Sequence, residues 1–234
     1  MCYSCNMAFL RRTKNRPKTY WLGQRVQELP DFIPASVRGA SLRITEIGEP
    51  VLHNKAKPVT VFGTPDLEEL IDDMFSTMDI AEGVGLAAPQ IGVDKQVFVY
   101  DVPDDNGDRH VGYIINPELT VLDETPLNRE EGCLSVPGAS AELERASKVE
   151  VKGYDFKGQP LHLTANGYLA RAFLHEYQHL QGTLYWDHLL PEEQKRALAE
   201  RDSRRSEVLN RRAEMAEIFQ KPHPPYPTQP AGGR

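Results

Sequence analysis

Two histidines and a glutamate occur at metal-binding spacing in the stretch His175-Glu176-Tyr177-Gln178-His179. Residues four positions apart lie on one face of a helix, so His175 and His179 can bind the same metal ion. Glu176 would then lie beside the ion, where its carboxylate could take a proton from a bound water. This H-E-x-x-H pattern predicts a metal-dependent hydrolase; the alternative is a polar helix that carries two unrelated histidines.

The third metal ligand decides between classes of metalloenzyme. A metzincin protease would have a third histidine where this chain has Tyr185, so that class is excluded. A thermolysin-like protease would need a downstream carboxylate such as Glu200, which lies in a charged stretch typical of a solvated helix face. Cys133 is a better candidate, because a thiolate and two imidazoles leave a fourth position for water. A lone cysteine is more often a small buried apolar residue, so this ligand set needs further support.

A glycine-rich stretch and the surroundings of Cys133 provide that support. Residues 83–90 read Gly-Val-Gly-Leu-Ala-Ala-Pro-Gln, and residues 131–135 read Glu-Gly-Cys-Leu-Ser. Together with H-E-x-x-H-L-x-G at residues 175–182, they resemble the three motifs of the peptide deformylase family, in the same order. The resemblance extends from about Ser41 to about Leu190.

This resemblance implies a metal-dependent hydrolase that removes the N-formyl group from the formyl-methionine of newly made polypeptides and releases formate. Cys133, His175 and His179 would hold one divalent ion. The family implies Fe(II), with zinc, nickel or cobalt able to occupy the site, whereas the donor set alone suggests zinc. The expected partners are N-formylmethionyl nascent peptides, and the ribosome exit region is a further candidate.

The same resemblance implies roles for the other motif residues. Glu176 would be the general base and would pass its proton to the departing amine. The Gln90 side-chain amide and the Leu134 backbone N–H would donate hydrogen bonds to the oxyanion. Gly85 and Glu131 would hydrogen-bond the substrate main chain. With Leu134, the residues expected to line the pocket for the methionine side chain are Val84, Tyr168, Arg171 and Ala172.

Two other classes of function remain as alternatives. A zinc endopeptidase would require a different third ligand, and cleavage of unformylated internal bonds would favour it. A non-catalytic peptide-binding or metal-stabilised module would not need Glu176 or Gln90 beside a complete ligand set. The surroundings of Cys133 argue against the first class, and the presence of every catalytic residue type argues against the second.

Composition fits one catalytic domain with extensions. The 234 residues are 40% hydrophobic, which is enough for one core. The net charge of −7 gives no overall sign of nucleic-acid binding. A membrane span needs about eighteen apolar residues, and no apolar run approaches that length. Only three cysteines occur, and Cys133 needs a free thiolate, so we expect a reducing compartment. We expect a monomer in the cytoplasm.

Four segments are expected along the chain. Residues 1–40 form a basic extension with seven Lys or Arg, partly ordered or disordered; if it is a transit peptide, the protein belongs to an organelle. Residues 41–190 form the catalytic domain, and 220–234 form a solvated proline-rich tail. Residues 191–219 form a C-terminal helix packed on the core through a thin apolar stripe. The members of this stripe are Leu198, Val208, Leu209, Met215 and Ile218.

The pattern of apolar residues predicts an α+β fold. Thr64 can cap an N-terminal helix whose apolar residues recur at helical spacing to about Ile80. A second helix can open at Asn166, carry the metal motif and end at Gly182. Strands are expected at residues 96–101, 111–116, 149–156 and 160–164. We expect antiparallel strands packed around a central metal-binding helix, with an N-terminal and a C-terminal helix beside them.

Overall fold

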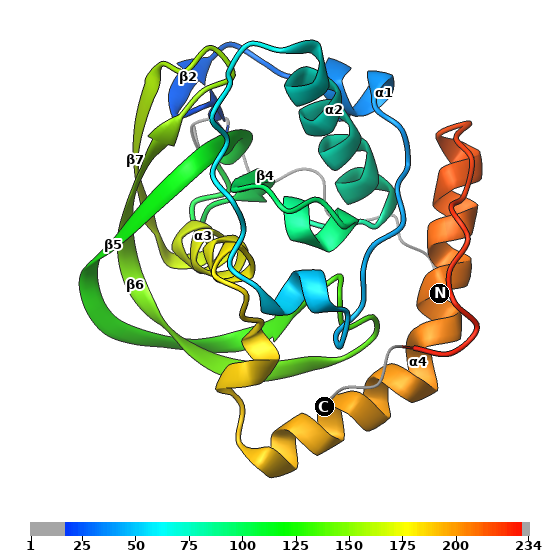
Figure 1. Ribbon diagram of the computed structural model, residues 1–234. Helices are drawn as coiled ribbons and strands as arrows, with labels where there is room; N and C mark the ends of the chain where they lie inside the picture. The colour runs from blue at the N-terminus through cyan, green and yellow to red at the C-terminus, as the bar shows by residue number, and fades with distance from the viewer. Residues whose placement is uncertain (1–16, 231–234) are drawn as a thin grey trace, which may run out of the picture.

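The computed structural model describes residues 17–230 and has an α+β fold, as predicted (Figure 1). The strands are β1 (Thr19–Trp21), β2 (Gln24–Val26), β3 (Gly85–Ala87), β4 (Val97–Pro103), β5 (Arg109–Gly132), β6 (Ser140–Tyr154) and β7 (Pro160–Asn166). The α-helices are α1 (Pro34–Arg38), α2 (Pro65–Ile80), α3 (Gly167–Leu180) and α4 (Pro191–Ile218). The short 3-10 helices are η1 (Pro50–His53), η2 (Ala88–Ile91) and η3 (Tyr185–His188). Within these residues, no helix is long and apolar enough to cross a membrane.

Strand β5 joins the parts of one mixed sheet. Its first residues pair with β1 in parallel and with β4 in antiparallel orientation, whereas its remainder pairs antiparallel with β6. The order along the sheet is β2-β1-β5-β4-β3, and β7 continues from β6. The β5–β6 register shifts between Ile115 and Pro126, and such bulges let strands bend. Figure 1 shows the bent pair curving around α3.

The sheet contains more strand than the sequence predicts. The four predicted strands are found in β4, β5, β6 and β7. However, β5 and β6 also include residues 117–132 and 140–148, for which no strand was predicted. Many of these residues are polar and exposed, so they lack the strict apolar alternation that signals a half-buried strand.

Helix α2 begins where the sequence predicts. The Thr64 hydroxyl accepts a hydrogen bond from the Leu67 N–H at 3.3 Å, and Pro65 occupies the first turn, where a missing N–H is tolerated. The buried face of α2 packs against β3, β4 and the start of β5. Its apolar members include Leu67, Ile71, Met74, Phe75 and Met78.

Helix α3 carries the metal motif and packs against the sheet through aromatic contacts. Leu169 and Phe173 belong to the same buried apolar cluster as Phe98 and Tyr100 of β4. The rings of Phe173 and Tyr100 meet edge to face, with centroids 4.9 Å apart. These contacts fix the distance of α3 from the sheet and its rotation about its own axis. They therefore fix the direction of its other face, which carries the histidines.

The C-terminal end of α3 is a Schellman motif. The Gly182 N–H donates to the His179 carbonyl at 3.2 Å, and the Thr183 N–H donates to the Gln178 carbonyl at 3.0 Å. Gly182 has φ +79°, and a Cβ there would lie 2.7 Å from the carbonyl carbon of Asn54. The prediction that Gly182 ends the metal helix is confirmed, and both the backbone angle and the space require glycine.

The described part of the N-terminal extension joins the core. Strand β1 pairs in parallel with β5, and the Trp21 ring lies 6.3 Å from Phe75 of α2 and 6.2 Å from Tyr113 of β5, between centroids. Of the seven Lys or Arg expected in the basic extension, Arg11, Arg12, Lys14 and Arg16 lie in residues 1–16, outside the described residues, so the transit-peptide alternative stays a prediction.

Helix α4 is present as predicted, but it docks through arginines. The expected apolar stripe is found only in part: Leu198 packs against a buried apolar cluster of the core, whereas Ile218 is 67% exposed and the other three residues are only half-buried. The face of α4 that is buried consists of Ala197, Arg201, Arg205, Arg212 and Ala216. This face meets polar groups of the core, and Arg205 forms an ion pair with the buried Glu46 at 2.7 Å. Guanidinium groups can satisfy such partners, whereas leucines could not.

The proline-rich tail folds back on the core. The Tyr226 hydroxyl accepts a hydrogen bond from the Ile44 N–H at 3.0 Å, and the Lys221 ammonium donates to the Ser36 carbonyl at 2.5 Å. The expectation of a solvated tail is therefore wrong for these residues, because composition does not reveal which single side chains find a partner. Residues 231–234 lie outside the described residues.

Substitution of Gly182 by alanine is expected to destabilise the protein more than the same change at Gly107. Both glycines have positive φ, so each alanine should cost about 1–2 kcal/mol of backbone strain. At Gly182 the new methyl would also overlap the backbone of Asn54, adding about 1–3 kcal/mol. At Gly107 nothing lies within 4 Å. Urea unfolding of both variants measures the difference; equal losses would contradict the role assigned to the Asn54 contact.

Candidate active site

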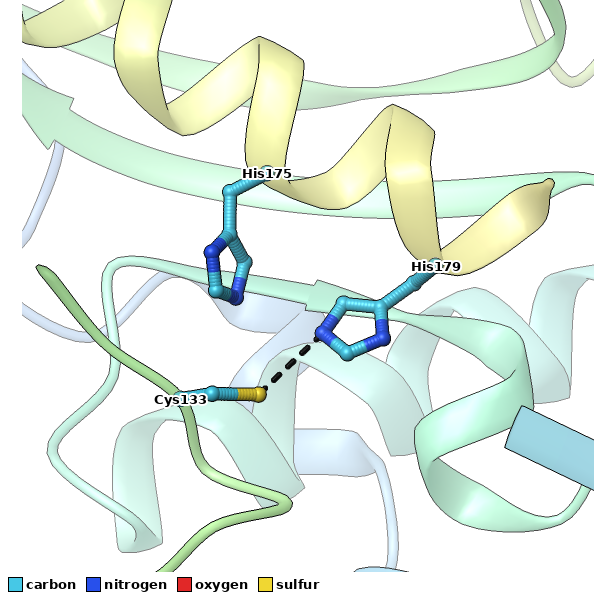
Figure 2. A group of neighbouring side chains, drawn as sticks. All are labelled: Cys133, His175 and His179. Carbon is cyan, nitrogen blue, oxygen red and sulfur yellow. Dashed lines mark hydrogen bonds between the residues drawn. The ribbon is translucent and has the colours of Figure 1, made fainter. Parts of the chain in front are cut away.

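Three potential metal ligands meet between β5 and α3. Cys133 follows the end of β5, and His175 and His179 lie one turn apart on α3 (Figure 2). One ligand atom from each residue lies within 4.8 Å of the others, and Cys133 Sγ is 3.2 Å from His179 Nε2. Cys133 and His175 are each 8% exposed, and His179 is fully buried. A thiolate and two imidazoles at this separation can hold one divalent ion and leave a position for water.

The His175 ring is oriented by a carboxylate. Its Nδ1 lies 2.6 Å from Glu131 Oε1, so we assign the proton to Nδ1, which leaves Nε2 as the metal-binding atom. Outer contacts of this kind fix the tautomer and the orientation of a metal-binding imidazole. His179 directs Nε2 to Cys133, and its Nδ1 has no hydrogen-bond partner within residues 17–230.

Glu131 is the centre of a buried ionic network. Its carboxylate is 7% exposed and accepts hydrogen bonds from Arg145, Arg171 and His175. Burial alone would raise the pKa of Glu131, but the hydrogen bonds from His175 and Arg145 outweigh it and hold the pKa far below its usual range. Arg145 was not predicted, because one arginine in a polar strand carries no motif. Only its place on β6, opposite β5, brings it to Glu131.

The Glu176 carboxylate lies against a glycine. A Cβ at Gly85 would overlap the Glu176 side chain, so glycine is what allows β3 and α3 to approach this closely. Glu176 is 4% exposed, and its Oε2 has no hydrogen-bond partner in the described part of the chain. Burial raises the pKa of Glu176 to about 7. A buried carboxylate oxygen with no protein partner is free to contact a water or a substrate.

Two amide donors lie next to Cys133. Gln90 Oε1 accepts a hydrogen bond from the Ala87 N–H at 2.8 Å, which turns its Nε2 toward Cys133 Sγ, 3.6 Å away, and Ser135 Oγ, 3.3 Å away. Leu134 follows Cys133 in a tight turn, and its N–H donates to no other group between residues 17 and 230. Ser135, the partner of Gln90, was part of the recognised motif but had no predicted role.

A cavity of about 340 Å³ opens beside these groups. His179 is the only residue predicted for the site that does not line it, because it is buried behind the other ligands. The predicted residues that do line it are Val84, Gly85, Gln90, Glu131, Cys133, Leu134, Tyr168, Arg171, Ala172, His175 and Glu176. Arg171 forms a fixed part of the wall, since its guanidinium donates to Glu131 and to the carbonyls of Leu127 and Leu143.

The donor set fits a catalytic metal ion. Structural zinc sites usually have four protein ligands, whereas catalytic sites have three and keep one position open. Here three potential ligands converge, and Glu176, whose Oε2 has no hydrogen-bond partner in the described residues, lines the cavity beside Cys133 and His175. The fold and this cluster together define a metal-dependent hydrolase.

Comparison with known proteins identifies the family. A family model described as polypeptide deformylase matches residues 41–195. Peptide deformylase 1 of Streptomyces avermitilis is 51% identical over 182 residues, which cover 74% of this chain and 82% of that protein. The peptide deformylase of Halothermothrix orenii is 49% identical over 146 residues, which cover 62% of this chain and 92% of that one.

Solved structures agree with the sequence matches. The crystal structure of a peptide deformylase from Legionella pneumophila superposes with a TM-score of 0.65 at 41% identity, covering 71% of this chain and 96% of that chain. The chain therefore belongs to the polypeptide deformylase family. Members of this family are metal-dependent hydrolases that remove the N-formyl group from nascent polypeptides.

Replacement of Glu131 by glutamine is expected to weaken metal binding. The amide cannot accept hydrogen bonds at both terminal atoms, so the His175 ring loses its fixed orientation and metal affinity should fall about 10–100-fold. Competition with a chelator at fixed pH, on protein shown to be folded by circular dichroism, measures this change. The matched control is Glu144→Gln, an exposed position on β6. If both variants bind metal as the wild type does, Glu131 does not orient His175.

Proposed function

We propose that this chain deformylates N-formylmethionyl peptides with one divalent ion held by Cys133, His175 and His179. The observation that carries the proposal is that their ligand atoms lie within 4.8 Å of one another, beside a cavity lined by Cys133, His175 and the buried Glu176. Fe(II) is the ion we propose for the cell, and zinc, nickel or cobalt could occupy the same donors.

The reaction requires a nucleophile, a base and stabilisation of negative charge. When bound, a divalent ion would bring the pKa of a coordinated water from 15.7 to about 7. Glu176 would accept the proton of the attacking water and pass it to the departing amine. The Gln90 amide and the Leu134 N–H would donate to the formyl oxygen as it gains negative charge. Through its contact with Nδ1, Glu131 would keep His175 in its metal-binding orientation.

The peptide would bind as an extended strand. Strand β3 lies at the end of the sheet order, so its second edge can pair with another chain, and Gly85 is its first residue. Gly85 and the main chain of Glu131 would hydrogen-bond the peptide backbone. The methionine side chain would enter the cavity, whose proposed walls are Val84, Leu134, Tyr168, Ala172 and the aliphatic part of Arg171.

The wider setting is also part of the proposal. We assign the reaction to residues 41–190 and infer a monomer that acts in the cytoplasm on chains near the ribosome exit. The polypeptide deformylase match over residues 41–195 supports the assignment of the catalytic segment. Residues 1–40 would decide an alternative location in an organelle.

Formate release from a formyl-Met tripeptide by anaerobically purified, Fe(II)- or Ni(II)-loaded protein tests the proposal. Wild type is expected to release formate, and Cys133→Ala is expected to lose metal and activity together. Glu176→Gln should retain metal but lose about 10²–10⁴-fold in kcat, the range typical of a general base. Glu144→Gln serves as the exposed control. A folded, metal-loaded wild type that releases no formate would contradict the proposed function, and full activity of Glu176→Gln would remove its assigned role.

A further inference from the structure

The turn formed by residues 133–136, named here the Cys133 turn, connects a metal ligand to an oxyanion donor. The Cys133 carbonyl accepts a hydrogen bond from the N–H of Val136, the last residue of the turn, at 2.9 Å. The Ser135 carbonyl accepts from the Ile47 N–H, also at 2.9 Å. The carbonyl between these two belongs to Leu134, and its partner comes from another part of the chain.

Arg212 of α4 holds the Leu134 carbonyl. Its Nη2 donates to that oxygen at 2.8 Å, and its Nη1 lies 3.3 Å from the hydroxyl of Tyr226. The side chain is buried, with the residue 3% exposed and Cζ 5.8 Å from the centre of the Tyr226 ring. In the described residues, the hydrogen-bond partners of the Arg212 guanidinium are thus the Leu134 carbonyl and the Tyr226 hydroxyl. Its charge acts on the Cys133 turn, because a charged donor makes a stronger hydrogen bond than a neutral one.

Holding the Leu134 carbonyl restricts the direction of the Leu134 N–H. The two groups belong to rigid peptide planes that meet at one Cα, so only two rotations separate them. The N–H has no partner of its own in the described chain and takes its direction from the turn. Helix α4 also contacts the next residues of the loop: a Cβ at Gly138 would lie 2.7 Å from the Cβ of Arg204.

We propose that Arg212 is a positioning residue for deformylation, which directs the Leu134 N–H to the oxyanion by holding the Leu134 carbonyl. The inference rests on the proposed function, since it needs Leu134 as an oxyanion donor. Arg212 does not line the cavity, so its loss should slow the chemical step without weakening peptide binding. Arg212 also lies beyond residue 195, where the family match ends. Its contact with the Leu134 carbonyl therefore comes from the C-terminal helix of this chain.

Lys221 offers a matched control. Like Arg212 it is a cation from the C-terminal part of the chain that donates to a backbone carbonyl, here that of Ser36 at 2.5 Å. Its partners lie in and beside α1 and α2, away from the Cys133 turn. Lys221→Met should therefore remove a contact of the same kind at α1 and α2 and leave the hydrogen bond between Arg212 and Leu134 in place.

The experiment compares Arg212→Met, Arg212→Lys and Lys221→Met in the full chain, loaded with Ni(II). Arg212→Met is expected to lower kcat for a formyl-Met tripeptide about tenfold, less than the about 10²–10³-fold cost of losing a donor outright. KM and metal content should stay near the wild-type values. Arg212→Lys should recover part of kcat, because an ammonium can still donate to the Leu134 carbonyl. Lys221→Met should keep the wild-type kcat.

A second readout does not depend on activity. Amide hydrogen exchange at Val136, whose N–H closes the Cys133 turn, should accelerate in Arg212→Met and stay unchanged in Lys221→Met. Wild-type kcat and exchange in folded Arg212→Met would overturn the inference, as would equal losses in Lys221→Met. If Arg212→Met does not fold, Arg212→Lys decides: a lower kcat with faster Val136 exchange supports the inference, and wild-type values overturn it. If the wild type releases no formate, the proposed function fails, and unchanged exchange would show separately that Arg212 does not hold the turn.

Discussion

The buried Glu131 carboxylate is the interaction on which the active site depends. It ties β5 to β6 through Arg145 and to α3 through Arg171 and His175. A charge removed from water needs partners of this kind, and these partners come from β6 and α3, the two elements that pack beside Glu131. The same contact also selects the His175 nitrogen that can bind metal. The carboxylate that joins the sheet to α3 is therefore also the group that orients His175.

Close approach of backbones is the second constraint on the site. Glycine at position 85 lets β3 reach the carboxylate of Glu176, and a Cβ at Gly83 would lie 2.7 Å from the Leu134 side chain. The glycine-rich stretch thus makes room for the Glu176 carboxylate on one side and for the Cys133 turn on the other. The role of its glycines is steric, which explains why residues without reactive side chains belong to the site.

Local spacing predicts the part of the site on α3, whereas the residues near β3 and around Cys133 were predicted only through the resemblance of their motifs. His175, Glu176 and His179 share a helix face, and Gly182 ends that helix through rules that involve neighbouring residues. The long polar halves of β5 and β6 were missed because their pairing, not their composition, makes them strands. The buried arginines of α4 were missed for a related reason. The sequence of a helix does not distinguish an arginine that donates to a buried carbonyl from an arginine that is exposed to water.

The contact between Tyr226 and Ile44 has a consequence for how the molecule folds. It joins groups 182 residues apart in the chain, and the entropy lost in closing a loop grows with its length. Tyr226 also contacts Arg212, whose other hydrogen bond reaches the Cys133 turn. The local turns of α2 and α3 can form early, whereas this closure must wait until both ends of the fold are in place. The backbone around Cys133 should therefore be among the last parts of the protein to become rigid.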